Sequence, residues 1–453
     1  MNKELIRKYN IPGPRYTSYP TVPYWDKEKL LPDDWVSMVK RSFDESNEED
    51  GISIYIHLPY CERLCTFCAC NRRITVNHLV EKPYIDRLLK EWKMYLDIFK
   101  KRPKIKEIHL GGGTPTFFSP GNLKSLISKI LSDAEVCDKA VFGFEGHPNN
   151  TTREHLETLY DLGFTRVSFG IQDFDPKVQD AINRVQTFEK VKEVVDIAKA
   201  LGYTSVNVDL VYGLPFQRKK SIVDTLNKVK QLKPDRIAFY SYAHVPWHKT
   251  GQRKFSEIDL PADEEKRELY ELGRDILETE GYYEIGMDHF ALETDELYKA
   301  ASGKTLHRNF MGYTPTYTQL LVGLGVSSIS DALYGFAQNA KTVEEYLDLV
   351  DKGMLPIFRG HKLTNEDLIV RKHITNIMCR YETNWVSIND RHPVIAEGLE
   401  RLGEILEDGL VTVGNDWLKV TEQGKPFLRN VCMAFDARLW RQVPETEVFS
   451  KTI

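Results

Sequence analysis

From residue 51 onward, short runs of β-branched and aromatic residues alternate with longer amphipathic segments. The runs predict six strands, at Ile52–Leu58, Ile105–Leu110, Ala140–Glu145, Arg166–Gln172, Ser205–Tyr212 and Arg236–Tyr242. The segments between them predict helices, at Tyr84–Phe99, Asn122–Leu131, Arg153–Leu162, Phe188–Leu201 and Ser221–Leu232. This alternation indicates an α/β protein with a parallel sheet, as a twisted open sheet or as a partial (β/α) barrel. The later runs read as more continuously apolar, which is typical of strands covered on both faces.

The pattern changes at both ends of this core. Residues 1–50 form an arm in which prolines and a glycine forbid a continuous helix. Residues 246–360 predict an extension that covers the site, with a helix at Ala262–Glu280 and irregular structure at 306–330. Residues 361–453 predict a mostly helical, winged-helix-like domain: Thr364 as the N-cap of a helix through Cys379, a helix at Pro393–Leu406, and a hairpin of Leu410–Val413 with Trp417–Thr421. The core domain is predicted at 51–245.

Composition narrows the class of protein. Of 453 residues, 42% are hydrophobic and 28% are charged, as in an ordinary globular protein. The chain lacks the long apolar stretch of a membrane span, and its first residues lack the apolar segment of a secretory signal, so we expect a cytoplasmic protein without a membrane partner. The chain has 61 basic and 66 acidic residues, a balance that gives no support for nucleic-acid binding. Residues 361–453 contain 12 basic and 14 acidic residues, so we expect this winged-helix-like domain to be a packing module and not a DNA-binding domain.

The seven cysteines are unevenly distributed. Cys137, Cys379 and Cys432 are scattered, and such cysteines are usually buried small hydrophobic residues. The other four fall within ten residues, at Cys61, Cys65, Cys68 and Cys70. A cluster of this kind in a cytoplasmic protein indicates a metal or redox centre.

The cluster follows the first predicted strand, at the end where α/β folds place their chemistry. The spacing Cys–x3–Cys–x2–Cys lets one short loop direct three thiolates inward, and three ligands would leave one iron of a four-iron cube open. A structural zinc site is an alternative, but it usually needs a second pair of cysteines elsewhere, and the chain has none. A group of inert thiols is the third interpretation. The spacing favours an iron–sulfur centre.

Other residues at predicted strand ends fit a ligand site. The run Gly111-Gly112-Gly113-Thr114-Pro115 follows the second strand and either lets the backbone approach a ligand or forms a simple turn. Glu145, Gln172 and Asp209 are polar residues near the carboxyl ends of three further strands. A cofactor ammonium group or ribose hydroxyl would pair with such side chains, and so would a neighbouring loop.

The loop Cys61–x3–Cys65-Thr66-Phe67-Cys68 resembles the radical S-adenosylmethionine superfamily. The resemblance implies a [4Fe–4S] cluster on three cysteines, whose open iron binds the amino and carboxylate groups of S-adenosylmethionine. An electron from the cluster then yields a 5′-deoxyadenosyl radical, and the protein positions the reactants.

Further motifs resemble one family in that superfamily, the oxygen-independent coproporphyrinogen III oxidases. They are Pro14–Thr21, Cys68–Asn71, Gly170–Phe174, Asp209–Pro215, Tyr242–His244, Gly286–Phe290, His307–Phe310 with Gly312-Tyr313, and Arg429–Met433. The resemblance runs from about residue 5 to the end of the chain. It implies a partial (β/α)6 barrel like a TIM barrel, with an N-terminal arm and a mostly helical C-terminal domain.

The implied activity is a step of heme (porphyrin) biosynthesis. Two propionate side chains of coproporphyrinogen III become vinyl groups without oxygen, which gives protoporphyrinogen IX. The radical removes a hydrogen from the propionate β-carbon, carbon dioxide leaves, and one electron passes to an unidentified acceptor. The expected partners are the substrate and a flavodoxin- or ferredoxin-like electron donor, and the enzyme is expected to be a monomer.

The resemblance also assigns roles to individual residues. The cluster ligands would be Cys61, Cys65 and Cys68, while Cys70 would be a non-ligand that activity requires. A first S-adenosylmethionine would contact Tyr55, Gly112, Glu145 and Ile329. A second molecule would contact Phe67, Gly113, Thr114, Gln172, Arg184, Asp209 and Ala243.

Some points stay open. His147 stands where the family often has an acidic residue, and it either ends a strand pointing outward or touches the substrate. The substrate carboxylates need cationic partners, for which the candidates are Arg15, Arg253, His289 and Arg308. Rival interpretations are a heme chaperone, which typically lacks the fourth cysteine and the arm, and another radical S-adenosylmethionine enzyme of tetrapyrroles, which methylates or degrades them.

Overall fold

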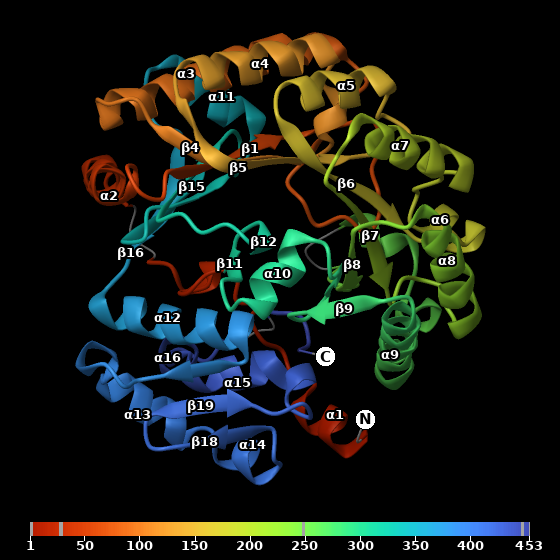
Figure 1. The fold of residues 1–453 in the computed structure, drawn as a ribbon, viewed down its shortest axis with the longest axis vertical. Coiled ribbons are helices and arrows are strands. Elements are labelled where there is room, and N and C mark those ends of the chain that lie inside the picture. The colour runs from red at the N-terminus through yellow and green to blue at the C-terminus, as the bar shows by residue number, and fades with distance from the viewer. Residues whose placement is uncertain (1–2, 27–29, 247–249, 445–447, 453) are drawn as a thin grey trace. The chain divides into compact units, whose positions relative to one another are not determined.

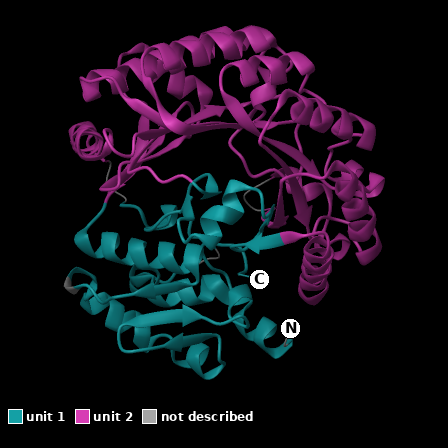
Figure 2. Ribbon diagram, in the orientation of Figure 1, with its two compact units in different colours: residues 1–27, 283–315, 363–453 teal, residues 28–282, 316–362 magenta. Residues whose placement is uncertain are grey.

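The fold is that of a computed structural model, which describes residues 3–26, 30–246, 250–444 and 448–452 (Figure 1). The chain divides into two compact units. Unit 1 comprises residues 1–27, 283–315 and 363–453, and unit 2 comprises residues 28–282 and 316–362 (Figure 2). The limits predicted for the four regions of the chain stay a prediction.

Unit 2 is built on one twisted sheet that contains all six predicted strands. These are β1 (Ile52–Leu58), β4 (Lys104–Gly112), β5 (Glu135–Gly146), β6 (Phe164–Gln172), β7 (Ser205–Tyr212) and β8 (Arg236–Ser241). They are neighbours in that order, and each pair is parallel. The α/β class and the partial barrel are confirmed.

The five helices predicted between these strands are also present, with ends shifted by a few residues. The helices of unit 2 are α2 (Pro32–Ser46), α3 (Glu81–Phe99), α4 (Pro120–Ser132), α5 (Arg153–Asp161), α6 (Pro176–Ala181), α7 (Phe188–Leu201), α8 (Lys219–Leu232), α9 (Asp263–Thr279) and α11 (Val343–Asp351). Side chains of Ser119, Thr152 and Thr187 cap the first turns of α4, α5 and α7. In Figure 1, α3, α4, α5 and α7 lie along the outer side of the sheet.

The prediction of irregular structure at 306–330 is wrong, because β11 (His307–Asn309) and β12 (Gly312–Thr314) form an antiparallel pair in its first half and two strands of the large sheet lie in its second half. The sheet continues beyond β1 through β13 (Leu320–Leu324), β14 (Ile329–Asp331), β15 (Gly335–Asn339) and β16 (Ile357–Lys362). Strand β13 is parallel to β1, and the other three are antiparallel to their neighbours. Gly323 is needed because β14 comes close: a Cβ atom there would lie 2.6 Å from the carbonyl oxygen of Ile329.

The expectation that the later strands are apolar on both faces is also wrong. In β7, Val206, Val208 and Leu210 are buried, while Asn207 and Asp209 alternate with them and are half-buried. Strand register extends this polar face to the other strands, since Tyr55 pairs with His109, Glu145 with Ser168, and Ser168 with Asn207. Polar side chains therefore line the face of the sheet opposite the helices.

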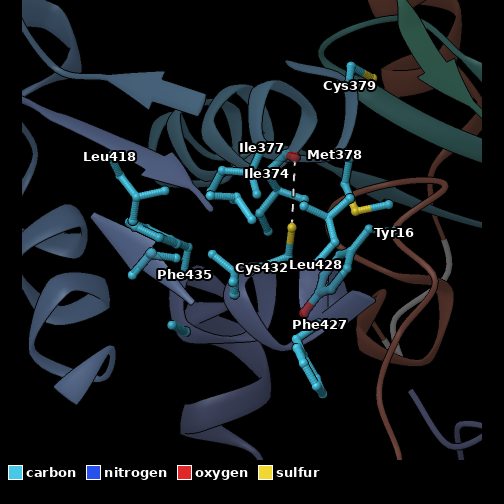
Figure 3. Packing of buried hydrophobic residues seen from close by; sticks show 14 of the residues in the cluster. Tyr16, Ile374, Ile377, Met378, Cys379, Leu418, Phe427, Leu428, Cys432 and Phe435 are labelled. Atoms are coloured by element: carbon cyan, nitrogen blue, oxygen red, sulfur yellow. Dashed lines mark hydrogen bonds between the residues drawn. The ribbon is translucent and has the colours of Figure 1, made fainter. Parts of the chain in front are cut away.

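Unit 1 is assembled from three separate stretches of chain. Its elements are α1 (Lys3–Tyr9), most of β9 (Tyr282–Ile285), β10 (His289–Leu292), α10 (Glu296–Ser302), β11 (His307–Asn309), β12 (Gly312–Thr314), α12 (Asn365–Arg380), β17 (Glu382–Asn384), α13 (Pro393–Glu400), α14 (Gly403–Glu407), β18 (Val411–Val413), β19 (Trp417–Val420), α15 (Leu428–Phe435) and α16 (Ala437–Arg441). Helices α12, α13 and α15 pack together, and Figure 3 shows Ile374, Ile377, Leu428 and Phe435 in their shared core.

Two predictions for unit 1 have different outcomes. Thr364 caps α12 in a capping box with Asp367, and β18 with β19 forms the predicted hairpin, so these elements are confirmed. The single helix predicted at 393–406 is wrong, because the chain leaves the helix at Arg401 and Leu402 and α14 begins at Gly403. A glycine in this position lowers helix stability and favours a break.

The N-terminal arm is bound to the C-terminal stretch. The Arg429 guanidinium donates hydrogen bonds to the carbonyl oxygens of Pro14 and Lys451, both at 2.8 Å, and also to that of Gly13. None of the helices that the structure describes combines the length and apolar composition needed to cross a lipid bilayer.

Candidate active site

The cysteine loop leaves the carboxyl end of β1 between two short parallel strands, β2 (Tyr60–Cys61) and β3 (Arg73–Ile74). Cys61, Cys65 and Cys68 are half-buried, and Cys70 is exposed. The Thr114 hydroxyl donates to Cys61 Sγ at 3.3 Å, and Arg184 Nη1 donates to Cys65 Sγ at 3.5 Å. The loop thus carries its sulfur atoms among hydrogen-bond donors.

The charges around the thiols differ from one cysteine to the next. A hydrogen bond from Cys70 lowers the pKa of Cys68, with help from Arg72 and Arg184, whereas burial raises the pKa of Cys61 to about 11. A lowered thiol pKa favours the thiolate, which is the form that binds metal. Cys61 also interacts electrostatically with Cys65 and Cys68. Among the described residues, no three His, Cys, Asp or Glu side chains are close enough together to hold a metal ion unaided, so the ligand set stays a prediction.

One side of the loop is held by the turn after α6. The backbone N–H of Thr66 donates to the Ile182 carbonyl at 3.0 Å, and the Asn183 side chain donates to the Leu64 carbonyl at 2.7 Å. Arg184 Nη2 donates to the Gly170 carbonyl at 2.6 Å, while its buried Nε finds no acceptor in the part of the chain that the structure describes. A cation fixed in place with a free donor is suited to an anionic ligand.

The glycine run makes room for the same loop. Gly113 donates its N–H to the Leu58 carbonyl at 2.9 Å, and a Cβ atom on it would lie 2.5 Å from the Pro59 carbonyl oxygen. Gly112 has a φ of +115°, and its missing side chain leaves space for the His57 ring. The run therefore lets the backbone come close to Pro59 and His57, while its approach to a ligand stays a prediction.

Tyr55 is oriented by a residue that the sequence analysis missed. His57 Nε2 lies 3.0 Å from the Asn71 carbonyl, so it carries the proton, and Nδ1 accepts from the Tyr55 hydroxyl at 3.1 Å. Burial lowers the pKa of His57, which is consistent with a neutral ring. The available signal was its position two residues after Tyr55, on the same face of β1.

The remaining predicted residues lie at successive strand ends of unit 2. Glu145 on β5 faces His109 Nε2 at 3.4 Å. Asp209 on β7 accepts hydrogen bonds from Ser168 and Asn207, at 2.9 and 2.8 Å. Gln172 ends β6 in a left-handed conformation, with a φ of 69°. Polar groups from three strands therefore face the same side of the sheet.

Two further predicted residues lie at the two ends of this series. Ile329 on β14 lies against Gly323 of β13, and Gly323 pairs with Tyr55 of β1. Ala243 follows β8 and is tied to Phe67 through the side chain of Gln252, another residue that the sequence analysis missed. The structure thus links Ile329 to Tyr55 through Gly323, and Ala243 to Phe67 through Gln252, while the two cofactor sets stay a prediction.

The unassigned residues have specific surroundings. His147 accepts the backbone N–H of Asn149 at 3.1 Å, and burial together with Arg184 and Arg63 lowers its pKa to about 2. His147 is therefore neutral at physiological pH.

Of the cationic candidates for the substrate, Arg253 belongs to unit 2, where its Nε donates to the Pro246 carbonyl at 3.1 Å.

These features fit an iron–sulfur cluster with a carboxylate-bearing cofactor beside it. The three half-buried thiols are the predicted donor set, the glycines allow close backbone approach beside the loop, and Arg184 Nε is a buried donor without an acceptor among the described residues. The family model of the radical SAM superfamily matches residues 55–229, which contain the cysteine loop and four of the strands that follow it. Fold and site together define a radical S-adenosylmethionine protein, which implies a [4Fe–4S] cluster and S-adenosylmethionine as cofactors.

Comparison with known proteins narrows the class to one family. The chain is 37% identical to the oxygen-independent coproporphyrinogen III oxidase of Pseudomonas aeruginosa, over 96% of this chain and 95% of that protein. It is also 37% identical to the enzyme of that name from Escherichia coli, over 99% and 98%. A solved structure of coproporphyrinogen III oxidase (HemN) from Escherichia coli superposes with a TM-score of 0.89, over 96% of this chain and 98% of that one. The chain belongs to the family of oxygen-independent coproporphyrinogen III oxidases.

Proposed function

We propose that the chain converts coproporphyrinogen III to protoporphyrinogen IX by decarboxylating two propionate side chains to vinyl groups without oxygen. The observation that carries this proposal is the cysteine loop at the polar strand ends, in a chain that aligns with named oxidases over nearly its whole length. The cluster, when bound and reduced, supplies the electron that splits S-adenosylmethionine and so generates the radical that starts the reaction. The residues of the chain hold and orient the reactants.

The proposed roles follow the two groups of contacts in unit 2. Cys61, Cys65 and Cys68 would hold the cluster. Tyr55, Gly112, Glu145 and Ile329 would bind the first S-adenosylmethionine, and a second would meet Phe67, Gly113, Thr114, Gln172, Arg184, Asp209 and Ala243. In support, His57 fixes the Tyr55 hydroxyl proton, so the oxygen of Tyr55 keeps its lone pairs for a donor such as an ammonium group.

Arg308 is the best supported of the four candidates for the substrate carboxylates. It lies on β11 of unit 1 and is only 8% exposed, and its Nε and Nη1 find no acceptor among the described residues. Its third nitrogen donates to the Arg15 carbonyl at 3.3 Å. The nearby carboxylate of Asp288 is already paired with His289 at 2.7 Å. A buried guanidinium with free donors favours a carboxylate ligand.

The test is anaerobic incubation of the reconstituted protein with coproporphyrinogen III, S-adenosylmethionine and a reductant. We expect carbon dioxide and the divinyl product by chromatography. Tight heme retention without decarboxylated product would instead indicate a heme chaperone, and a methylated or ring-opened product another tetrapyrrole enzyme. The use of a flavodoxin- or ferredoxin-like donor, the monomeric state and the cytoplasmic location are proposed with this function.

A further inference from the structure

Gln252 ties the cysteine loop to the last strand of the parallel series. It lies in the 3₁₀ helix Thr250–Lys254 and is 1% exposed. Its Nε2 donates to the Phe67 carbonyl at 3.3 Å and to the Ala243 carbonyl at 3.1 Å, and its Oε1 accepts the Val245 N–H at 2.6 Å. Both hydrogens of the amide and its oxygen are therefore used, in a place where water does not replace them.

The two carbonyl groups belong to residues of one proposed pocket. Phe67 lies between Cys65 and Cys68, and Ala243 follows β8, and both are proposed to line the second S-adenosylmethionine. The loop segment next to Phe67 is fixed from the other direction, because Thr66 donates to the Ile182 and Ala181 carbonyls. Gln252 therefore sets where Phe67 lies relative to Ala243, while the turn at 181–182 sets where the loop lies relative to α6.

We infer that Gln252 is a positioning residue for the second S-adenosylmethionine. The inference rests on the proposed function, and it assigns to Gln252 the task of keeping the two walls of that pocket at a fixed separation. A ligand that contacts both walls then binds without the entropic cost of ordering them. Gln252 acts through the backbones of Phe67 and Ala243, and the hydrogen bonds that its side chain makes to described residues all go to backbone groups outside the cysteines.

The chemistry of the amide gives matched variants. Gln252→Glu keeps the length and the acceptor for Val245 but replaces both donors with a carboxylate oxygen, which is repelled by the Phe67 and Ala243 carbonyls. Gln252→Met keeps the length and carries no charge, but it makes none of the three hydrogen bonds. Gln231 on the exposed side of α8 gives the control, since Gln231→Glu makes the same chemical change where only a helix carbonyl is contacted.

The experiment is calorimetric titration of the anaerobic holoenzyme with S-adenosylmethionine, together with iron and sulfide analysis. The wild type and Gln231→Glu should bind two molecules per chain. In Gln252→Glu and Gln252→Met, one of the two binding events should weaken about tenfold or more, since a lost buried hydrogen bond costs about that factor. The other binding event and the iron content should be unchanged, and the KM for S-adenosylmethionine should rise more than kcat falls.

Several results would overturn the inference. If both variants melt at a lower temperature but bind two molecules as the wild type does, Gln252 has a structural role only. If they lose iron, it positions the cluster instead. If the variants do not fold, hydrogen exchange on the wild type decides, because the second binding event should protect the amides at 65–68 and 243–245 together, and independent protection contradicts the inference. A wild type that binds two molecules but forms no divinyl product would contradict the proposed function alone.

Discussion

The same amino acid serves two different purposes in the two units. In the loop of unit 2, Cys61, Cys65 and Cys68 are half-buried, and hydrogen-bond donors surround them. In the core of unit 1, Cys432 is completely buried and Cys379 is 4% exposed. Burial raises the pKa of Cys379 to about 12 and holds the pKa of Cys432 well above its usual value, whereas a hydrogen bond from Cys70 lowers the pKa of Cys68. The environment, and not the residue type, decides whether a thiol is reactive.

The packing around Cys432 shows why it stays inert. Figure 3 places its side chain beside Ile374 and Leu428, and among the described residues its sulfur makes one hydrogen bond, a long one to the Ile374 carbonyl oxygen at 4.0 Å. A thiolate there would lose its hydration without gaining strong donors. Cys432 therefore acts as a small apolar residue, in contrast to the cysteines of the loop.

The comparison would break down if the loop thiols were not ligands, and Cys61→Ala tests this with the largest expected effect. Removing one of three ligands should abolish the cluster, because the remaining two cannot hold a cube. We expect loss of the brown colour, of the visible absorbance and of stoichiometric iron and sulfide after anaerobic reconstitution. Cys379→Ala, matched in chemistry but located in unit 1, should retain all three. Unchanged iron in Cys61→Ala would remove Cys61 from the ligand set.

Cys70 sharpens the comparison inside the loop, since it is exposed and is proposed not to bind iron. Cys70→Ser should keep the iron content and the cluster spectrum of the wild type but lose divinyl product by 100-fold or more, on the order of a missing catalytic group. Product analysis by chromatography, normalised to iron, provides the measurement. Full turnover in this variant would show that Cys70 is dispensable.

The contrast between the two sets of cysteines could be predicted from spacing alone, and so could much of unit 2. Strands β1 and β7 and helix α7 have the predicted limits, because each is a run of one period bounded by turn residues. Spacing also placed Cys61, Glu145 and Asp209 at strand ends. These elements depend on local sequence patterns, which can be recognised in a single sequence.

The features that could not be predicted depend on contacts between distant segments. Strand β13 contains a glycine and follows a polar region, and it is a strand because β1 provides a parallel edge at residues 52–56. Gln252 lies 185 residues from Phe67, its hydrogen-bond partner, and nothing local marks it. The polar face of β7 follows from the alternation of Asn207 and Asp209 with buried Val206, Val208 and Leu210, a local signal that the continuous β-branched character of the run masks.

A buried acid in the core of unit 1 should make stability depend on pH, because burial raises the pKa of a carboxyl group as it raises that of a buried thiol. Burial raises the pKa of Asp436 to about 6, although it accepts hydrogen bonds from Tyr16 and Leu439. At Asp436 the folded state then binds more protons than the unfolded state between pH 4 and 6, so the contribution of this group to stability falls as pH rises through this range, by about 3 kcal/mol. Asp436→Asn should flatten this dependence in urea unfolding measured from pH 4 to pH 7.

A matched control strengthens that measurement. Asp408 lies in the same unit, and its hydrogen bond with Lys8 lowers its pKa. Asp408→Asn should therefore leave unchanged the loss of stability that Asp436 causes between pH 4 and 6. A wild-type stability that rises over the same range would mean that Asp436 is ionised in the core and that its hydrogen bonds outweigh burial.

The smallest expected effect compares two cysteines outside the loop. Cys432→Ser places a hydroxyl group in the apolar core shown in Figure 3, where among the described residues the sulfur makes one long hydrogen bond, to the Ile374 carbonyl, and should lower the free energy of unfolding by about 1–3 kcal/mol. Cys137→Ser, at a half-buried position of β5, should change it by less than about 0.5 kcal/mol. Both variants should keep wild-type iron, because neither residue belongs to the loop. Equal stability of the two variants would mean that the hydroxyl finds a good partner in the core, and that burial alone does not separate the two kinds of cysteine.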